Sequence, residues 1–396
     1  MARPAVAGPF ALACLLWLGG CATGRNYEAL LALGDIAAGT GPSRLKKITP
    51  EPTRATVSYE AAGHTYRADL YLPGGGRVEA GIVLVPGAVP EGKDDERLVA
   101  LAKTFARLRY AVLAPELSGY RELKIGPRHV REVAEAVRHL ASRQEWAPEG
   151  RVGIGAFSYG AGPAIAAALE DDVRGRVRFV LAVGGYYNLR SALRFLTTGA
   201  FEENGKLRRL EASEYGKLVF IRSTMDLLAQ AGDRAAFEAM IQAKLKDPTA
   251  DVSALARALD PEGLAVYRLL SNSDPAQTQR LIAALPARIV ETIDALTLDN
   301  KPLSKLQARL ILVHGRDDRL IPYSESLALA KSVAPGQARV FLIHHILSHV
   351  DLGMSHLFSR RFWSEELPDA WRLWRAQVLV LKERDLSAAA ARADAD

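Results

Sequence analysis

The sequence predicts an α/β protein in which a mostly parallel central sheet carries helices on both faces. Short, β-branched apolar runs alternate with stretches whose apolar residues recur at helical spacing, which is typical of a parallel sheet. A long helical stretch, residues 189–305, precedes the last two of these strands. The chain has 396 residues, of which 49% are hydrophobic and 24% are charged, so we expect one large domain with an insertion.

The N-terminal segment, residues 1–20, has the composition of an export signal. It carries one positive charge at Arg3 and an apolar run at 5–18 that is short for a membrane span, and a Leu-Gly-Gly-Cys sequence ends at Cys21. The segment resembles a bacterial lipoprotein signal, which implies cleavage before Cys21 and a lipid anchor on that cysteine. By the same resemblance, Ala22 favours the outer membrane of the cell envelope over the inner one. An ordinary secretory signal or an uncleaved anchor are the alternatives.

The core of the predicted fold is expected over residues 56–188 and 306–385. Residues 21–55 contain a Gly-Thr-Gly-Pro run and are expected to form a tether and a lead-in. The predicted elements of the core are, in order along the chain, a hairpin at 56–59 and 65–72, a strand at 81–85, a helix at 98–108, a strand at 110–115, a helix at 130–140, and strands at 177–183, 309–314 and 339–343.

Residues 189–305 are expected to form a helical cap. Apolar residues recur at helical spacing at Phe237, Met240, Ile241 and Leu245, and again over 282–296. An insertion at this point would lie at the carboxyl ends of the strands, where it would shape a pocket. A helical appendage without substrate contact is the alternative. Residues 386–396, rich in Ala and Asp, are expected to be a flexible tail.

The nine residues 154–162, Ile-Gly-Ala-Phe-Ser-Tyr-Gly-Ala-Gly, are typical of a nucleophile elbow. An apolar strand passes through Ser158 into a helix of small residues, and Ala156 and Gly160 are small enough for the two elements to approach each other. The Ser158 hydroxyl would project above the sheet, and the backbone N–H of Tyr159 would point at a developing oxyanion. Because Ala156 stands where glycine is commonest, an ordinary strand–helix turn is the alternative interpretation.

A serine in such an elbow needs an acid and then a histidine, each on a loop after a later strand. The predicted strand at 309–314 leads into a polar loop at 315–322, and the strand at 339–343 leads into a loop at 344–351 that contains three histidines. The order of the three motifs is therefore the one that a serine nucleophile requires.

At this point the chain resembles the α/β-hydrolase family, with some likeness to its dienelactone hydrolase and prolyl-peptidase-like branches. The sequence His-Gly-Arg-Asp-Asp, residues 314–318, resembles the acid loop of the family, which implies Asp318 as the acid. The same resemblance implies His349 as the base. Asp317 remains a candidate for the acid.

His345 and His356 remain candidates for the base, and His314 is expected to be structural. The run at 81–90 resembles the oxyanion loop of the family, except that Pro86 replaces the usual histidine. Because the donor in such a loop is a backbone N–H, the replacement leaves the chemistry possible. Ala88 is the first candidate for this donor and Val89 the second.

These motifs together predict a serine hydrolase that cleaves ester, thioester or small amide bonds through an acyl-enzyme intermediate. A catalytically inactive binding or assembly module of the same fold, and an acyltransferase with the same residues, are the alternatives. The expected partners are a small acyl-containing substrate and, through lipidated Cys21, a membrane at the bacterial cell envelope. The sequence does not indicate the substrate or the oligomeric state.

Cysteine usage and charge exclude several other classes. The only cysteines are Cys14 and Cys21, so the folded part is expected to contain no disulfide and no cysteine-ligated metal, and no HExxH pattern occurs. We therefore expect no cofactor and no metal. The net charge of +6 is spread over the whole length without a basic block that interleaves aromatics, so a nucleic-acid partner is not expected.

Overall fold

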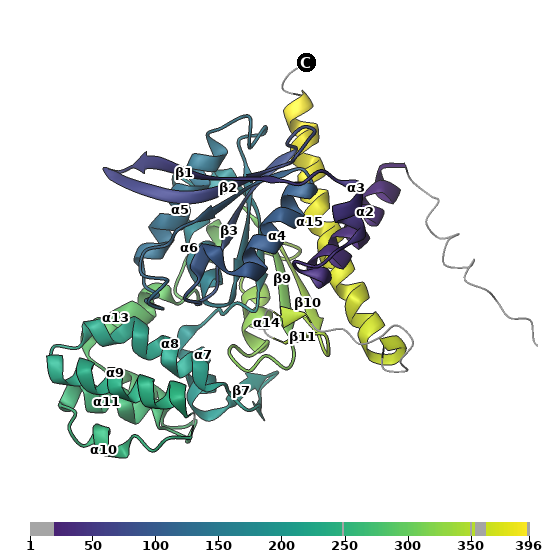
Figure 1. Ribbon diagram of the computed structural model, residues 1–396. Coiled ribbons are helices and arrows are strands. Elements are labelled where there is room, and N and C mark those ends of the chain that lie inside the picture. The colour runs from purple at the N-terminus through teal and green to yellow at the C-terminus, as the bar shows by residue number, and fades with distance from the viewer. Residues whose placement is uncertain (1–19, 248, 349–350, 353–361, 394–396) are drawn as a thin grey trace, which may run out of the picture.

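An eight-stranded sheet forms the centre of the molecule (Figure 1). The computed structural model describes residues 20–247, 249–348, 351–352 and 362–393. The strands are β1 (Thr53–Ala61), β2 (His64–Leu72), β3 (Ala80–Val85), β4 (Tyr110–Pro115), β5 (Val152–Phe157), β6 (Val177–Val183), β7 (Ala200–Glu203), β8 (Lys206–Arg209), β9 (Arg309–Gly315), β10 (Ala338–Ile343), β11 (Leu347–Ser348) and β12 (Asp351–Leu352).

Helices cover both faces of this sheet. The α-helices are α2 (Gly20–Ala38), α3 (Arg44–Ile48), α4 (Glu96–Arg107), α5 (Arg128–Ala141), α6 (Ala161–Ala167), α7 (Leu189–Thr198), α8 (Glu214–Thr224), α9 (Ala231–Lys246), α10 (Ser253–Ala256), α11 (Pro261–Leu270), α12 (Thr278–Ala283), α13 (Ala287–Leu296), α14 (Ser324–Lys331) and α15 (Leu367–Ala393). Short helical turns are η2 (Gly92–Asp94), η3 (Ser158–Gly160), η4 (Arg174–Arg176), η5 (Met225–Leu227), η6 (Leu303–Lys305) and η7 (Phe362–Glu366).

The strand order is β1-β2-β4-β3-β5-β6-β9-β10, and all strands from β4 to β10 in this order are parallel. The hairpin β1–β2 adds the antiparallel edge and turns at Ala62 and Gly63, both with positive φ, as a two-residue hairpin turn requires. The predicted mostly parallel sheet is thus confirmed. Parallel strands end at one edge of the sheet, so the loops after β3, β5 and β9 meet there.

Two hydrophobic layers sandwich the sheet. On one face, side chains of α5, α6 and α14 pack against the sheet residues Val83, Ile154 and Leu312. On the other face, α4 and α15 pack against Ile82 and Val313, and α2 lies outside them as a further layer. All-round burial explains why β3 to β9 appear in the sequence as continuous apolar runs instead of alternating patterns.

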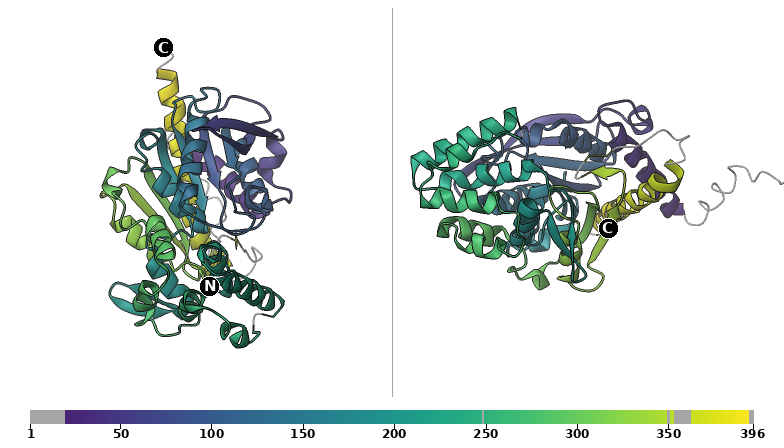
Figure 2. Two further views of the ribbon diagram at one scale, coloured as in Figure 1. Left: turned by 90° about the vertical axis from the view of Figure 1, so that its left-hand side faces the viewer. Right: turned by 90° about the horizontal axis from the view of Figure 1, so that it is seen from below.

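The inserted segment from α7 to α13 forms a cap with its own hydrophobic cluster. Phe237, Met240 and Ile241 are buried in it, whereas Leu245 is 59% exposed because it lies near the C-terminal end of α9. The segment also contains the hairpin β7–β8, which a purely helical prediction omits. The cap lies at the end of the molecule opposite the pair α2–α15 (Figures 1 and 2).

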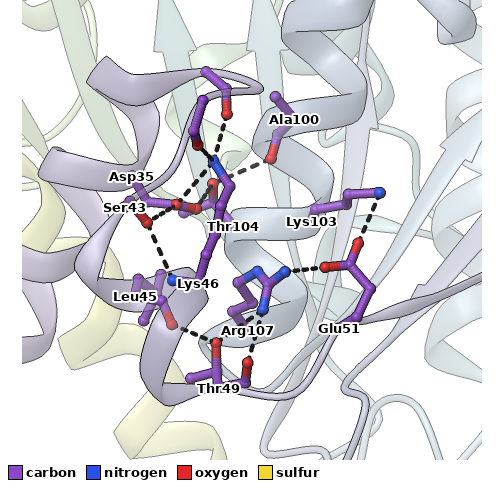
Figure 3. A network of polar contacts seen from close by, with 12 residues as sticks. Asp35, Ser43, Leu45, Lys46, Thr49, Glu51, Ala100, Lys103, Thr104 and Arg107 are labelled. Atoms are coloured by element: carbon purple, nitrogen blue, oxygen red, sulfur yellow. Dashed lines mark hydrogen bonds and ion pairs between the residues drawn. The ribbon is translucent and has the colours of Figure 1, made fainter.

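The N-terminal region differs from the expected tether, because α2 and α3 pack on the core. Asp35 of α2 is 1% exposed and accepts hydrogen bonds from the hydroxyls of Thr104 on α4 (2.7 Å) and of Ser43 (Figure 3). Lys46 pairs with the same carboxylate (3.2 Å) and donates to two carbonyl groups of the loop between α2 and α3. A side-chain network therefore fixes this region where small residues suggested freedom.

The C-terminal helix also extends further than expected. α15 continues to Ala393, through most of the expected tail. Its Arg384 is buried and pairs with Glu28 of α2 (2.6 Å) and with Glu79 (3.2 Å), and its Asp385 pairs with Arg25 of α2 (2.6 Å). We call the pair α2 and α15, together with the adjoining α4, the flank. The ion pairs explain why the two chain ends are helical there.

Candidate active site

The turn from β5 into α6 has the backbone geometry of a nucleophile elbow. Ser158 has a φ of +51°, a left-handed conformation that costs a non-glycine residue about 1–3 kcal/mol. It begins the turn η3, which leads into α6, and it is 5% exposed. Such strain persists only where the surroundings enforce it, which points to a functional residue.

Close packing against the backbone enforces this turn. A Cβ atom on Gly160 would lie 2.3 Å from the carbonyl oxygen of Pro86, and one on Gly87 would lie 3.2 Å from Cβ of Ser158. The loop after β3 therefore presses directly on the elbow: Gly160 leaves no room for a side chain, and the contact at Gly87 is tight. Ala156 is fully buried in β5, where its methyl group is accommodated, so the departure from glycine at this position leaves the turn intact.

The loop after β3 offers one backbone donor more readily than the other. The N–H of Val89 donates to the carbonyl of Gly87 (2.9 Å), whereas among the described residues the N–H groups of Ala88 and Tyr159 have no acceptor. Tyr215 of the cap donates its hydroxyl to the carbonyl of Ala88 (2.7 Å) and so connects this loop to the cap. The geometry favours Ala88 over Val89 as partner of Tyr159 in an oxyanion hole.

The acid loop after β9 holds one buried carboxylate. Asp318 is fully buried, and its Oδ1 accepts hydrogen bonds from the N–H groups of Leu320 (2.8 Å) and Ile321 (3.0 Å), while Asp317 is exposed. Burial raises the pKa of the Tyr159 hydroxyl, and the negative charge of Asp318 raises it further. The acid candidate therefore lies close enough to the elbow for its charge to act on the residue after Ser158.

The two described histidines among the site candidates, His314 and His345, have structural partners. Nε2 of His314 donates to the carbonyl of Ile321 (2.9 Å), which leaves Nδ1 to accept from the hydroxyl of Ser326 (2.7 Å). This ring lies 3.3 Å from Asp318 and is fully buried, so it braces the acid loop. His345 lies 3.6 Å from Asp369 of α15 and makes no contact with Ser158 among the described residues.

His349 and His356 lie outside the described residues. His349 falls in the sequence between β11 and β12, which pair antiparallel. Leu347 of β11 lines the same cavity as Ser158. The start of this loop is fixed by Asp369, which accepts hydrogen bonds from the backbone N–H groups of His344 (2.9 Å) and His345 (2.7 Å).

A cavity of about 1000 Å³ begins at Ser158 and Ala88. Its lining includes residues 211–215 of the cap and Arg319 on one side and the flank on the other. A volume of this size lies at the upper end of the range for small-molecule sites. Among the described residues, no cluster of three or more His, Cys, Asp or Glu side chains could hold a metal ion.

Three residues that hold the loops around the site belong to no recognisable sequence motif. The first is Tyr215, described above. Lys93 is another, because its buried ammonium group pairs with Asp69 of β2 (2.9 Å) and anchors the end of the Ala88 loop. Glu325 of α14 is the third: it is 4% exposed and accepts from the N–H groups of Tyr187 (3.0 Å) and Asn188 (2.7 Å) after β6. Burial raises the pKa of Glu325, although these donors oppose the effect.

Comparison with known sequences gives short matches. A scan against models of protein families finds none that matches. Over 91 residues, or 23% of its length, the chain is 31% identical to a 2-hydroxy-6-oxo-2,4-heptadienoate hydrolase of Pseudomonas putida. Over the same number of residues it is 31% identical to a 2-hydroxymuconate semialdehyde hydrolase of a Pseudomonas species. The matches cover 33% and 32% of these relatives, about a third of their length.

Comparison with solved structures covers most of the chain. A proposed hydrolase of Legionella pneumophila aligns with a TM-score of 0.55 and 15% identity over 86% of this chain and 93% of that one. An esterase domain of a Rhodothermus marinus protein aligns with a TM-score of 0.45 and 14% identity over 84% and 98%. The chain has the α/β-hydrolase fold, so the resemblance expected from the motifs is confirmed at the level of fold.

Proposed function

We propose that the protein is a serine hydrolase that cleaves carboxylic esters, with thioesters and small amides as related substrates. The observation that carries the proposal is the left-handed Ser158 at the carboxyl end of β5, opening onto a cavity and flanked by the N–H groups of Ala88 and Tyr159. The fold and the partial sequence matches to two hydrolases support hydrolase chemistry in general. The proposal that the cleaved bond is an ester is based on the geometry of the site at Ser158.

In the proposed reaction, Oγ of Ser158 attacks the carbonyl carbon of the ester while His349 takes the hydroxyl proton. Asp318 orients the imidazole ring and stabilises its charged form. The N–H groups of Ala88 and Tyr159 bind the oxyanion, the alcohol leaves with the proton from His349, and water releases the acid from Ser158. Support for His349 is its position two residues after Leu347, which lines the cavity.

Hydrolysis of p-nitrophenyl acetate by the full-length protein tests this function. We expect activity that falls by about 10³-fold or more in both Ser158→Ala and His349→Ala. His345→Ala serves as the matched control, and its activity is expected to stay within a few-fold of the wild type. A folded wild-type protein without activity would favour a binding module, and ester transfer to an added alcohol in place of hydrolysis would favour an acyltransferase.

We further propose that the protein is anchored by lipidated Cys21 at the bacterial cell envelope, on the outer membrane. The residues on the solvent-facing side of α2 support this location, because none of them is charged: Gly24, Tyr27, Leu30, Gly34 and Ala37. A solvated helix normally turns charged residues outward. Exposed Trp371 of α15 stacks on Trp374, which donates to the carbonyl of Asn26 of α2 (2.9 Å), so an aromatic pair lies beside this surface.

No helix in the described part of the chain is both long and apolar enough to cross a membrane. The attachment that we propose is a lipid on Cys21. Incorporation of labelled palmitate into the protein in a Gram-negative host tests it: we expect label in the wild type and none in Cys21→Ala. Label that persists in Cys21→Ala would contradict the anchor.

A further inference from the structure

The cavity at Ser158 has two halves of different character. The cap half is bordered by Glu211, Glu214 and Arg319, which are exposed and charged. The flank half lies between the strand ends and the three helices α2, α4 and α15. Both halves meet at Ser158, so a substrate whose reacting carbon lies at Oγ would extend in both directions.

The flank half is lined mainly by aliphatic side chains, contributed in pairs by its three helices: Leu33 and Ile36 of α2, Leu98 and Leu101 of α4, and Leu373 and Val380 of α15. The charged residues that border it are Asp95 and Arg97, which pair with each other (2.7 Å). Gln377 is the buried polar exception on α15. This half therefore offers apolar contact and no uncompensated charge.

The flank half is held open by contacts made elsewhere. Asp35, between Leu33 and Ile36 in sequence, bonds to Thr104 of α4 (2.7 Å), and Trp374, beside Leu373, bonds to the backbone of α2 (2.9 Å). These polar contacts set the spacing of the helices, so the aliphatic residues between them line a space and do not close it. Apolar surface left in this way gains most from an apolar ligand.

We propose that the flank half binds the acyl chain of the ester substrate and that the cap half receives its polar alcohol portion; this inference rests on the proposed hydrolase function. Attack by Ser158 transfers the acyl group to Oγ and breaks the bond to the alcohol oxygen, which takes up a proton. The alcohol leaves from the charged, exposed cap half. The acyl chain remains between α2, α4 and α15 until water releases it as a carboxylic acid. The substrate class is thus an ester of a long, apolar acid.

Kinetics with p-nitrophenyl esters of increasing acyl length test the proposal. Each buried methylene group can raise kcat/KM by up to about fourfold, so we expect the dodecanoate to exceed the acetate by at least about tenfold. The full-length protein is used in one detergent at one concentration throughout, so that partition of the ester into micelles is the same for every variant.

Two substitutions fill the flank half from different helices. Ala376→Trp on α15 and Ala100→Trp on α4 each place an indole among lining residues, and we expect each to lower the dodecanoate-to-acetate ratio of kcat/KM by at least about fivefold. Ala389→Trp, at an exposed position of the same α15, is the matched control and should leave the ratio within about twofold. If one of the two tryptophan variants fails to fold, the dodecanoate-to-acetate ratio of the other still tests the proposal.

A binding experiment separates this inference from the function. Ser158→Ala protein is irradiated with a long-chain fatty acid that carries a diazirine at its chain end, and the adducts are located by peptide mass spectrometry. We expect adducts on α2, α4 or α15 that decrease when Ala376→Trp is added. Adducts confined to the cap, or a flat chain-length profile in an active enzyme, would overturn the acyl site and leave the hydrolase function standing. Adducts on the flank without any esterase activity would retain the binding site and refute the function.

Discussion

The elbow and the flank border the same cavity but are held by different forces. At the elbow, small residues press on backbone atoms, and a single added methyl group at Gly160 would meet the Pro86 carbonyl at 2.3 Å. At the flank, charged and hydroxyl side chains such as Asp35 and Thr104 connect helices through buried polar contacts. The first arrangement sets one geometry within tenths of an ångström, whereas the second sets a spacing that can adjust.

This difference teaches where the molecule tolerates change. Catalytic geometry depends on contacts that no side chain can relax, so errors at the elbow are expected to remove activity. Packing at the flank depends on several polar contacts in parallel, so the loss of one is expected to lower stability and leave the elbow formed. The following variants test this contrast.

The largest effect is expected at the acid loop. Asp318→Asn keeps the shape of the side chain but removes the charge that, in the proposed mechanism, orients His349, so kcat/KM for p-nitrophenyl acetate should fall by about 10³-fold or more. Asp317→Asn, its exposed neighbour, should change kcat/KM by less than about threefold. Equal losses in the two variants would show that the acid has been assigned to the wrong residue.

Gly160→Ala should follow in size. Because the added Cβ meets a backbone oxygen, the elbow must shift, and we expect kcat/KM to fall by about 10²-fold with a lower melting temperature. Gly232→Ala on α9, where nothing lies within 4 Å of the new Cβ, is the matched control and should be neutral or slightly stabilising. Full activity in Gly160→Ala would refute the steric account of the elbow.

Asp35→Ala tests the flank. Removal of this buried carboxylate takes the ion-pair partner from Lys46 and one acceptor from the hydroxyls of Ser43 and Thr104, so urea unfolding should show a loss of stability of about 1–3 kcal/mol. Asp171→Ala removes an ion pair whose carboxylate is 83% exposed, and it should cost less than about 0.5 kcal/mol. A loss no larger than that of Asp171→Ala would mean that packing alone holds α2.

The smallest effect is expected at Glu325 and depends on pH. Its pKa is raised in the folded state, so its stabilising contribution is complete below the ordinary value of 4.5 and is lost as the pH rises through the folded value. Glu325→Gln removes this dependence. As the pH rises from 5 to 8, the melting temperature of the variant should therefore rise relative to that of the wild type. A constant difference across that range would show that Glu325 does not titrate in it.

The elbow could be predicted from the sequence because its determinants are consecutive. An apolar strand, a serine and small residues follow one another within 154–162. The acid and histidine loops are also short local patterns, and their order after the serine supports the same prediction. The sheet was predictable for the same reason, since β3 and β4 are continuous apolar runs.

The flank could not be predicted because its partners are distant in the sequence. Arg25 and Asp385 are 360 residues apart, and neither end of the chain shows a pattern that requires the other. The Gly-Thr-Gly-Pro run at 39–42 suggested a tether, but the residues before it form the 19-residue helix α2. Tyr215, which connects the loop at Ala88 to the cap, has no neighbouring motif either. The packing of α2 on α15 and the contact made by Tyr215 depend on polar contacts between residues far apart in the sequence. Local secondary-structure propensity does not predict such contacts.

Labelling with a fluorophosphonate, followed by peptide mass spectrometry, tests the central claim most directly. Fluorophosphonates react only with a serine whose hydroxyl is activated, so the account predicts one adduct, on Ser158, that is absent from Ser158→Ala and much slower to form in Asp318→Asn. A folded full-length protein that forms no adduct, or an adduct on another serine that survives in Ser158→Ala, would contradict it.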